Sequence, residues 1–155
     1  MNYSEITAPT EYHMIVALAD IAGFARASQN LSNRELFDML DEFYELIGGI
    51  VEDAGGKVVK FMGDGALIVF PEEMAKRAIE ALGKIKMEAN DWLSRFGLSC
   101  RIYLKAHIGS VICGPLGTAK EKHFDVIGDT VMKLFLSPSG DFVLSPELEQ
   151  IVQAR

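Results

Sequence analysis

Apolar residues recur along this chain with two different periods, and each switch between them marks the start of a new element. Short apolar or alternating runs predict strands, because successive side chains of a strand point to opposite faces. The predicted strands cover residues 13–19, 57–61, 66–70, 99–108, 111–113, 124–127 and 142–144. Glycine-rich stretches at 63–65 and 114–117 are expected to turn the chain.

Two longer segments have the period of an amphipathic helix. Ser32 and Glu35 have the spacing of a capping box, and the helix that follows is expected to stop at the glycine pair 55–56. Pro71 is expected to open the second long helix, because proline is tolerated in a first turn. The remaining predicted helices are short and begin after Gly128 and at Pro146.

The predicted order is β-α-β-β-α-β with additions, which is the ferredoxin-like arrangement of the α+β class. In that arrangement the first strand lies beside the hairpin that follows the first helix. We therefore expect Asp20, at the end of the first strand, to face Asp64 in the hairpin turn. No linker, internal repeat or low-complexity segment is visible, so residues 1–155 are expected to form a single domain.

Asp20 and Asp64 have similar settings, because each follows a strand and has glycines nearby. A strand holds such a carboxylate in place, while amides of the neighbouring turn remain free to bind phosphate. Two carboxylates at the ends of adjacent strands would form a two-metal clamp suited to phosphoryl chemistry. A Gly-Asp-Gly sequence alone is usually only a turn, so this hypothesis depends on the strands being neighbours.

The composition is that of a globular domain, with 49% hydrophobic and 24% charged residues in a chain of 155. A net charge of −7 argues against a general nucleic-acid binder, which needs a basic face. An anionic ligand then requires a metal ion or a local basic pocket. No apolar run reaches the length of a transmembrane helix and the start does not resemble a signal peptide, so no membrane contact and a cytoplasmic location are expected.

The cysteines and histidines indicate no site of their own. Cys100 and Cys113 lack metal-ligand spacing, which favours reduced and partly buried side chains. His13, His107 and His123 are scattered along the chain, and a structural role is the better interpretation of each.

Four short segments form a recognisable series. They are Leu18-Ala19-Asp20-Ile21-Ala22-Gly23-Phe24, Lys60-Phe61-Met62-Gly63-Asp64-Gly65, His107-Ile108-Gly109 and Phe124-Asp125-Val126-Ile127-Gly128-Asp129-Thr130-Val131. In this order and at this spacing they resemble the successive motifs of class III adenylate and guanylate cyclase domains. The resemblance extends from about residue 13 to about residue 150 and implies the cyclase fold. One motif alone would be weak evidence, whereas four in register are hard to explain otherwise.

The resemblance implies a site for a nucleoside triphosphate and two divalent metal ions, Mg²⁺ or Mn²⁺. Asp20 and Asp64 match the family's metal-binding aspartates, and the Ile21 carbonyl matches a backbone ligand. The residues that match the phosphate-binding loop are Ala22, Gly23, Phe24 and Ala25. Family members form a 3′,5′-cyclic nucleotide and pyrophosphate; one metal activates the ribose 3′-hydroxyl and the other holds the triphosphate.

The resemblance also assigns the choice of base. Lys60 and Asp125 match the family's base-selecting pair. A lysine donates to a ring nitrogen and an aspartate accepts from an amino group, which suits adenine, whereas the guanine-selecting members commonly use Glu and Cys. ATP is therefore the expected substrate. In isolation, Lys60 would be interpreted as a solvated strand residue and Asp125 as a cap beside a turn.

The segment after Val131 departs from the family's pattern. The family carries an Asn that orients the ribose and an Arg that meets charge at the α-phosphate, and Met132 and Leu136 stand at these positions here. A register shift would offer only Lys133 as a cation. The sequence also ends before the strands in which many members place a phosphate-binding lysine. Loss of such donors typically lowers the rate by roughly a hundredfold or more.

Three hypotheses about function follow from this pattern. The first is a homodimeric domain that binds metal and ATP but turns over slowly or not at all. The second is a working adenylate cyclase in which other groups replace the missing donors. The third is a non-catalytic dimerisation module, or a half-site that completes a different cyclase chain. The family forms its sites at a head-to-tail dimer interface, one chain giving the metal ligands and the other the base-selecting and transition-state groups.

Overall fold

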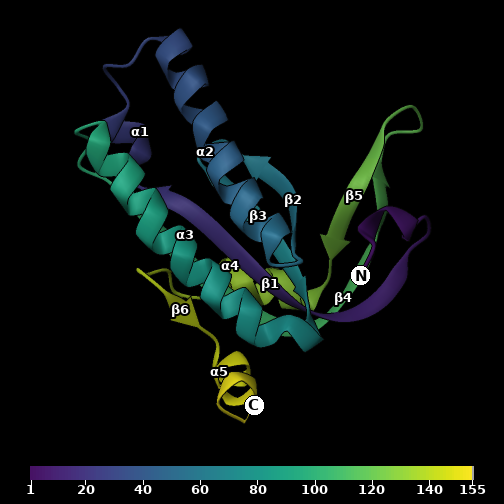
Figure 1. Cartoon of the computed structure of the whole chain (residues 1–155). Coiled ribbons are helices and arrows are strands. Elements are labelled where there is room, and N and C mark those ends of the chain that lie inside the picture. The colour runs from purple at the N-terminus through teal and green to yellow at the C-terminus, as the bar shows by residue number, and fades with distance from the viewer. Residues whose placement is uncertain (155) are drawn as a thin grey trace.

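The computed structural model of the chain describes residues 1–154 and contains one six-stranded sheet flanked by helices (Figure 1). The strands are β1 (Thr10–Ala22), β2 (Lys57–Met62), β3 (Gly65–Pro71), β4 (Arg101–Gly117), β5 (Lys122–Ile127) and β6 (Val143–Leu144). The α-helices are α1 (Phe24–Ala27), α2 (Asn33–Asp53), α3 (Ala75–Arg95), α4 (Asp129–Leu136) and α5 (Pro146–Ala154). Short 3₁₀ turns, η1 (Tyr3–Glu5) and η2 (Glu72–Met74), complete the described elements.

Strand β1 occupies the centre of the sheet, whose order is β2-β3-β1-β4-β5, with β6 pairing β4 off this path. Both neighbours of β1 run antiparallel to it, and the pairing with β4 extends from Thr10 opposite Cys113 to Ala22 opposite Arg101. The predicted α+β class is confirmed, and so is the position of the first strand beside the hairpin. The strand is longer than expected, because residues 10–12 and 20–22 on either side of the apolar run also pair with β4.

The turn predicted at 114–117 is wrong. Gly114 and Pro115 continue β4 and pair with Asp125 and Phe124 of β5. Pairing with β1 stops at Cys113. Pro115 therefore lies where β4 has a partner on one side only, which is where a strand tolerates proline. The chain turns at residues 118–121 instead, where Thr118 and Glu121 exchange backbone hydrogen bonds of 2.9 and 3.2 Å.

The expected start of the second long helix is also wrong. Pro71 is the last residue of β3 and lies opposite Met14 of β1. Its extended backbone, with φ −60° and ψ 145°, caps the turn η2. Helix α3 begins only at Ala75. The same fixed φ angle suits both an extended residue and a first helical turn, so the sequence alone did not separate the two.

Helix α2 begins as the sequence predicted. The Ser32 hydroxyl accepts a hydrogen bond from the Glu35 amide, and the Glu35 carboxylate accepts one from the Ser32 amide, both at 3.1 Å. This capping box satisfies two of the amides that every helix start leaves without an intrahelical partner.

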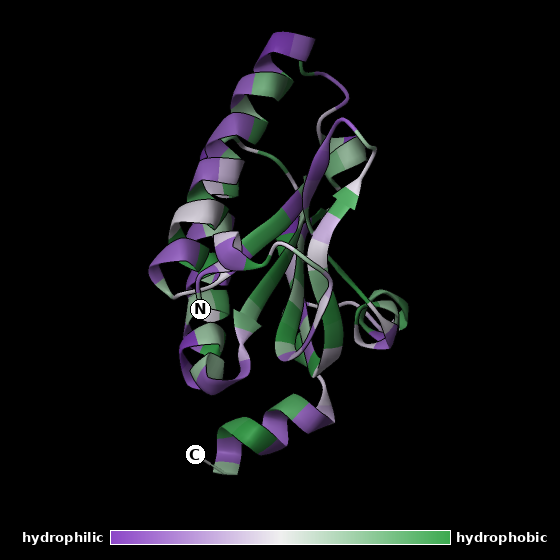
Figure 2. Cartoon of the chain, turned by 90° about the vertical axis from the view of Figure 1, so that its right-hand side faces the viewer, coloured by the Kyte–Doolittle hydropathy of each residue, from purple (hydrophilic) through white to green (hydrophobic). Residues whose placement is uncertain are grey.

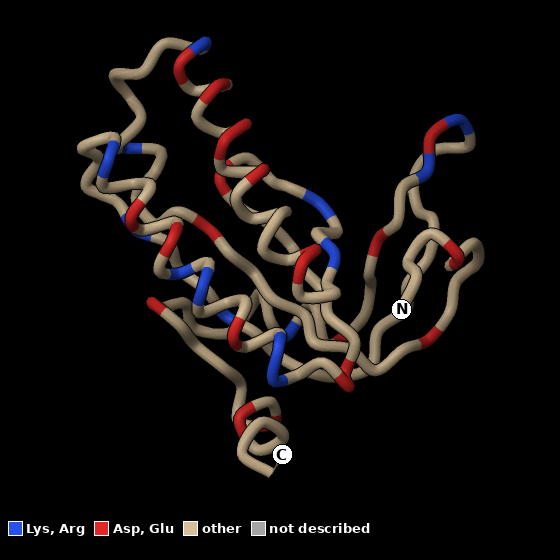
Figure 3. Tube along the Cα trace, viewed as in Figure 1, with Lys and Arg blue, Asp and Glu red and all other residues tan. Residues whose placement is uncertain are grey.

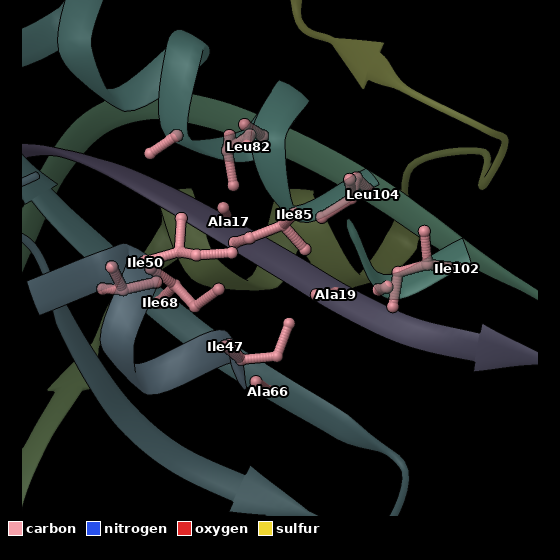
Figure 4. Packing of buried hydrophobic residues seen from close by; sticks show 14 of the residues in the cluster. Ala17, Ala19, Ile47, Ile50, Ala66, Ile68, Leu82, Ile85, Ile102 and Leu104 are labelled. Carbon is pink, nitrogen blue, oxygen red and sulfur yellow. The ribbon is translucent and has the colours of Figure 1, made fainter. Parts of the chain in front are cut away.

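The main core lies between the sheet and the two long helices α2 and α3 (Figure 4). Its labelled members are Ala17, Ala19, Ile47, Ile50, Ala66, Ile68, Leu82, Ile85, Ile102 and Leu104. Figure 2 shows the strands as largely apolar, while each long helix has an apolar and a polar side. The opposite face of the sheet carries a second, smaller cluster that includes Val131 and Leu134 of α4. This face bears the residues considered next.

Candidate functional site

Asp20 and Asp64 lie together at the end of β1, as the sequence predicted. Asp20 pairs with Gly65 across β1 and β3, and the Ile21 amide donates a 3.2 Å hydrogen bond to the Asp64 carbonyl. Both aspartates, the acid pair, line one pocket of about 260 Å³, which we call the acid-pair pocket. The sheet register, rather than chance proximity, therefore brings the two carboxylates to the same place.

The two carboxylates lie close together without an ion-pair partner among the described residues. Asp20 lies at the exposed rim of the pocket, yet the surrounding protein removes part of its hydration. This desolvation, followed by the negative charge of Asp64, raises the pKa of Asp20, while the positive charge of Lys105 opposes the shift. Within residues 1–154 neither aspartate forms an ion pair with a basic side chain. An unpaired acid pair of this kind suits a divalent cation.

A pair of carboxylates is a donor set that fits magnesium or manganese. Residues 1–154 contain no group of three or more His, Cys, Asp or Glu side chains arranged to hold a metal. Mg²⁺ typically takes one or two protein carboxylates and completes its shell with water and substrate phosphates. Two carboxylates and the nearby Ile21 carbonyl would therefore hold ions whose remaining ligands come from a phosphorylated substrate.

The turn that carries Asp64 is held by Tyr44 of α2, a residue that sequence reasoning missed. The Tyr44 hydroxyl donates a 2.6 Å hydrogen bond to the Gly63 carbonyl, and its ring stacks on Phe61 with a centroid separation of 3.9 Å. Gly63 has φ +62°, a left-handed conformation that glycine adopts without strain. No periodicity in α2 marks Tyr44 as a partner of this turn.

The loop after β1 leads directly into α1. Ala22 ends the strand, Gly23 caps the helix with φ +79°, and Phe24 and Ala25 form its first turn. The Phe24 side chain is buried and anchors the loop to the core. The first amides of a helix lack intrahelical acceptors, so those of this turn are available to an anion.

Lys60 and Asp125 meet although they lie on opposite edge strands of the sheet. The Lys60 ammonium lies 3.3 Å from one carboxylate oxygen of Asp125, while the other oxygen accepts a 2.8 Å hydrogen bond from the Val126 amide. Lys57, also on β2, lies 5.6 Å from the ring centroid of Phe124 on β5. Figure 3 shows the positive charge of β2 and the negative charge of β5 that meet here.

Asp125 lines a different pocket from the one that contains Asp20 and Asp64. Asp125 lines a small pocket of about 50 Å³ together with the apolar side chains of Ile112, Leu116 and Ile127. The acid-pair pocket is lined by none of these residues. Asp125 and the two aspartates therefore line two separate pockets of the chain.

A family model, that of the adenylate and guanylate cyclase catalytic domain, matches residues 7–133. The chain belongs to this family. The match covers every element from β1 to the middle of α4. It confirms the resemblance that the four sequence segments indicated.

Individual relatives agree with this assignment. An adenylate cyclase of Anabaena cylindrica is 26% identical over 135 residues, covering 82% of this chain and 27% of the relative. Adenylate cyclase 2 of Rhizobium meliloti is 22% identical, covering 79% of this chain and 36% of the relative. The chain thus spans only about a third of the length of these relatives.

Solved cyclase structures share the fold. The adenylyl cyclase CyaB of P. aeruginosa superimposes with a TM-score of 0.87 at 19% identity, over 95% of this chain and 83% of that one. The guanylyl cyclase Cya2 gives a TM-score of 0.83 at 20% identity, over 94% and 81%. Within residues 1–154 of this cyclase domain, no helix is both long and apolar enough to cross a bilayer.

Helix α4 of this cyclase domain has aliphatic side chains at the two positions that the sequence resemblance matches to the family's Asn and Arg. Met132 and Leu136 are 59% and 82% exposed, and they lie four residues apart on one side of the helix. Lys133 forms a 3.0 Å ion pair with Asp129 of the same helix. The cation that a register shift would have supplied is thus engaged within α4.

Lys105 is a second residue that sequence reasoning missed. It is only 8% exposed, and its ammonium donates hydrogen bonds to the carbonyls of Phe135 at 3.2 Å and Ser137 at 2.7 Å. The same side chain lines the pocket of Asp20 and Asp64. The sequence does give one sign of its role, because Lys105 is a charged residue within the apolar alternation of β4.

The remaining candidates have structural partners. His107 lies 2.8 Å from the Ser145 hydroxyl, which also accepts a hydrogen bond from the Leu148 amide at the start of α5. Cys100 and Cys113 are free thiols, and burial raises the pKa of Cys113 to about 11. Neither cysteine has the lowered pKa of a reactive thiol.

Proposed function

We propose that this domain binds ATP with two divalent metal ions, Mg²⁺ or Mn²⁺, and converts it to cyclic AMP and pyrophosphate slowly or not at all. The single observation that carries this proposal is that Asp20 and Asp64 line one pocket and that neither forms an ion pair within residues 1–154. Family membership supplies the reaction class, and the geometry of this pair supplies the reason to expect metal and phosphate at this place.

Asp20, Asp64 and the Ile21 carbonyl would hold the ions. When bound, the ions lower the pKa of the ribose 3′-hydroxyl and neutralise the triphosphate. In the reaction a bond forms between O3′ and the α-phosphorus, the bond from that phosphorus to the pyrophosphate oxygen breaks, and the hydroxyl proton passes to water. Amides at Phe24 and Ala25 would donate to phosphate oxygens.

Adenine would be read by Lys60 and Asp125. The lysine donates to a ring nitrogen and the aspartate accepts from the exocyclic amino group. The ion pair of 3.3 Å in the free chain supports a fixed position for both groups, and a bound base has to open this pair or lie beside it. Guanine presents a carbonyl where adenine has its amino group, so Asp125 would face an acceptor without a proton.

A head-to-tail homodimer would complete the site. The acid-pair pocket of about 260 Å³ lies below the roughly 300–1,000 Å³ of typical ligand sites, so one chain encloses too little of a nucleotide. Large apolar side chains are exposed on β4, β5 and α4; some lie beside Asp125 and others, such as Phe135, beside the pocket of Asp20 and Asp64. They are Ile112, Leu116, Ile127, Met132, Phe135 and Leu136. We call Asp20 and Asp64 the metal half-site, and Lys60 and Asp125 the base half-site. Burying the apolar side chains against a second copy would join the metal half-site of each chain to the base half-site of the other.

The proposed weakness of turnover rests on α4. The aliphatic side chains of Met132 and Leu136 donate no hydrogen bond to charge that builds on the α-phosphate. Binding depends on the carboxylates of Asp20 and Asp64 and on the Lys60–Asp125 pair, which this chain has, whereas the rate depends on groups that act only in the transition state. Binding is therefore expected to survive better than catalysis, and a nucleotide-binding module without turnover is the second candidate function.

Calorimetric titration of the purified chain with Mn²⁺ and ATP, followed by product analysis, tests this proposal. Asp64→Asn should weaken Mn²⁺·ATP binding by about tenfold or more, because it removes one of two carboxylate ligands. The matched control is Asp141→Asn, which alters an exposed carboxylate paired with Arg101 at 2.9 Å. Binding that Asp64→Asn leaves unchanged would refute the site, and product analysis separates the slow cyclase from the module that only binds.

A further inference from the structure

Lys105 places a buried positive charge beside the acid pair without forming an ion pair with it. Its position on β4 is opposite Leu18, two residues before Asp20, so its side chain and that of Asp20 lie on the same face of the sheet. The ammonium ends at the carbonyls of Phe135 and Ser137, where α4 terminates. Lys105 is therefore held in place from the sheet below and the helix end above.

Two of the three ammonium donors are used by these carbonyls. An ammonium group has three N–H donors. Within residues 1–154, Lys105 has no hydrogen-bond partner besides Phe135 and Ser137. A buried ammonium that lacks a full set of partners is costly in the free chain. An anion in the pocket that Lys105 lines would supply the missing acceptor.

A positive charge in this pocket would be close to the phosphates of a bound nucleotide. Ions held by Asp20 and Asp64 would bring substrate phosphates into the space that Lys105 also lines. Helix α4, which ends over the same pocket through Phe135, presents no cation of its own there, since Lys133 pairs with Asp129. Lys105 is the basic side chain among the described lining residues.

We propose that Lys105 is a phosphate-binding residue of this domain, donating its remaining N–H to a phosphate oxygen of the nucleotide. This inference rests on the proposed function, because it requires a triphosphate in the pocket of Asp20 and Asp64. Lys105 would thus supply a positive charge next to the phosphates from β4. This charge does not depend on the residues at positions 132 and 136. The recognised chemistry is the polyphosphate, not the base.

A merely structural role makes a different prediction. If Lys105 only anchors the end of α4, its removal should loosen the pocket and weaken every ligand together. If it binds phosphate, removing its charge should weaken polyphosphate binding, while Mn²⁺ alone binds as well as before or more tightly. The second effect follows because a positive charge near Asp20 and Asp64 repels a metal cation.

The experiment compares Lys105→Met and Lys105→Gln with the unchanged chain. Glutamine keeps N–H donors for the carbonyls of α4 without the charge, so it remains informative if the methionine variant does not fold. Lys133→Met is the matched control, because it removes an exposed lysine that lines no part of the acid-pair pocket. The probes are Mn²⁺ alone, followed by electron paramagnetic resonance, and Mn²⁺·ATP and Mn²⁺·tripolyphosphate, followed by calorimetry.

We expect the Lys105 variants to bind Mn²⁺·ATP and Mn²⁺·tripolyphosphate on the order of tenfold more weakly, with binding of Mn²⁺ alone undiminished. Lys133→Met should match the unchanged chain. Equal affinities for polyphosphate, or parallel loss of polyphosphate and Mn²⁺, would overturn the inference while leaving the proposed function intact. Absence of Mn²⁺·ATP binding by the unchanged chain would overturn both.

Discussion

The hydroxyl of Tyr44 donates a 2.6 Å hydrogen bond to the carbonyl of Gly63, the residue that precedes Asp64. This bond ties the middle of α2 to the turn between β2 and β3. Stacking of the Tyr44 ring on Phe61 fixes the direction of the hydroxyl. A helix on the core side of the sheet thus sets the position of a proposed metal ligand, although it contributes no ligand itself.

Tyr44→Phe should therefore weaken the metal site while keeping the ring stack. Loss of one hydrogen bond to the turn is expected to reduce Mn²⁺·ATP affinity about fivefold, which corresponds to about 1 kcal/mol. Calorimetry measures this change. Tyr12→Phe, on the first part of β1, is the control and should leave the affinity unchanged. If Tyr44→Phe binds Mn²⁺·ATP as tightly as Tyr12→Phe and the unchanged chain do, the turn holds its shape without Tyr44.

Asp125→Asn tests the choice of base. Its amide can keep one oxygen toward the Val126 N–H, as the carboxylate does at 2.8 Å, so the change falls on the oxygen that faces Lys60. The unchanged chain should bind ATP better than GTP by about 1–3 kcal/mol if the pocket excludes water. The variant should lose most of this difference in competition binding. A preference of the unchanged chain for GTP would contradict the assignment of this pair.

The double change Met132→Asn with Leu136→Arg tests the cause of the expected slow turnover. Both side chains are exposed, so the change should alter the melting temperature little, yet it should raise cyclic AMP formation by about a hundredfold if the helix presents the new groups correctly. The measurement is a single-turnover assay with Mn²⁺·ATP. Formation of cyclic AMP by the unchanged chain at about 1 s⁻¹ or faster would refute slow turnover outright.

Tyr3 should make stability depend on alkaline pH. Burial, followed by nearby Cys113 and Glu73, raises its pKa from 10.0 to about 12, and its hydroxyl donates a 3.1 Å hydrogen bond to the Gly55 carbonyl. Between these values the unfolded chain has lost the phenolic proton and the folded chain keeps it. The Tyr3 contribution is thus complete below pH 10 and is lost as pH rises toward 12.

Denaturant unfolding at several pH values checks this dependence. The difference in free energy of unfolding between the unchanged chain and Tyr3→Phe should shrink from about pH 9 to pH 12, because the phenylalanine side chain of the variant does not titrate. Other alkaline effects act on both proteins and cancel in the difference. A difference that stays constant over this range would show that Tyr3 ionises as readily in the folded chain as in the unfolded one.

Local chemistry explains which parts of the fold the sequence predicted. The capping box of Ser32 and Glu35 acts within one helical turn, and the position of Asp20 beside Asp64 follows from the order of the first elements. The contact of Lys60 with Asp125 depends on how far the edge strands curve toward each other, which no pattern along the chain records. The family resemblance assigned both residues to base selection but did not predict their contact.

The features that the sequence did not predict also depend on contacts between distant segments. Pro115 and Gly114 have the composition of a turn, but pairing with β5 on one side overrides their local preference. Tyr44 and Lys105 act through the backbone carbonyls of distant segments. Any residue offers such carbonyls, so the sequence of the accepting segment gives no sign of the contact.

Strand β4 is one uninterrupted span of 17 residues, and this continuity lets it act as a spacer within the sheet. Lys105 stands at the metal half-site and Gly114 pairs with Asp125 at the base half-site, nine residues and roughly 30 Å farther along. In the proposed dimer, two such spacers run between the same two composite sites. Each composite site of that dimer would then be connected to the other by both β4 strands.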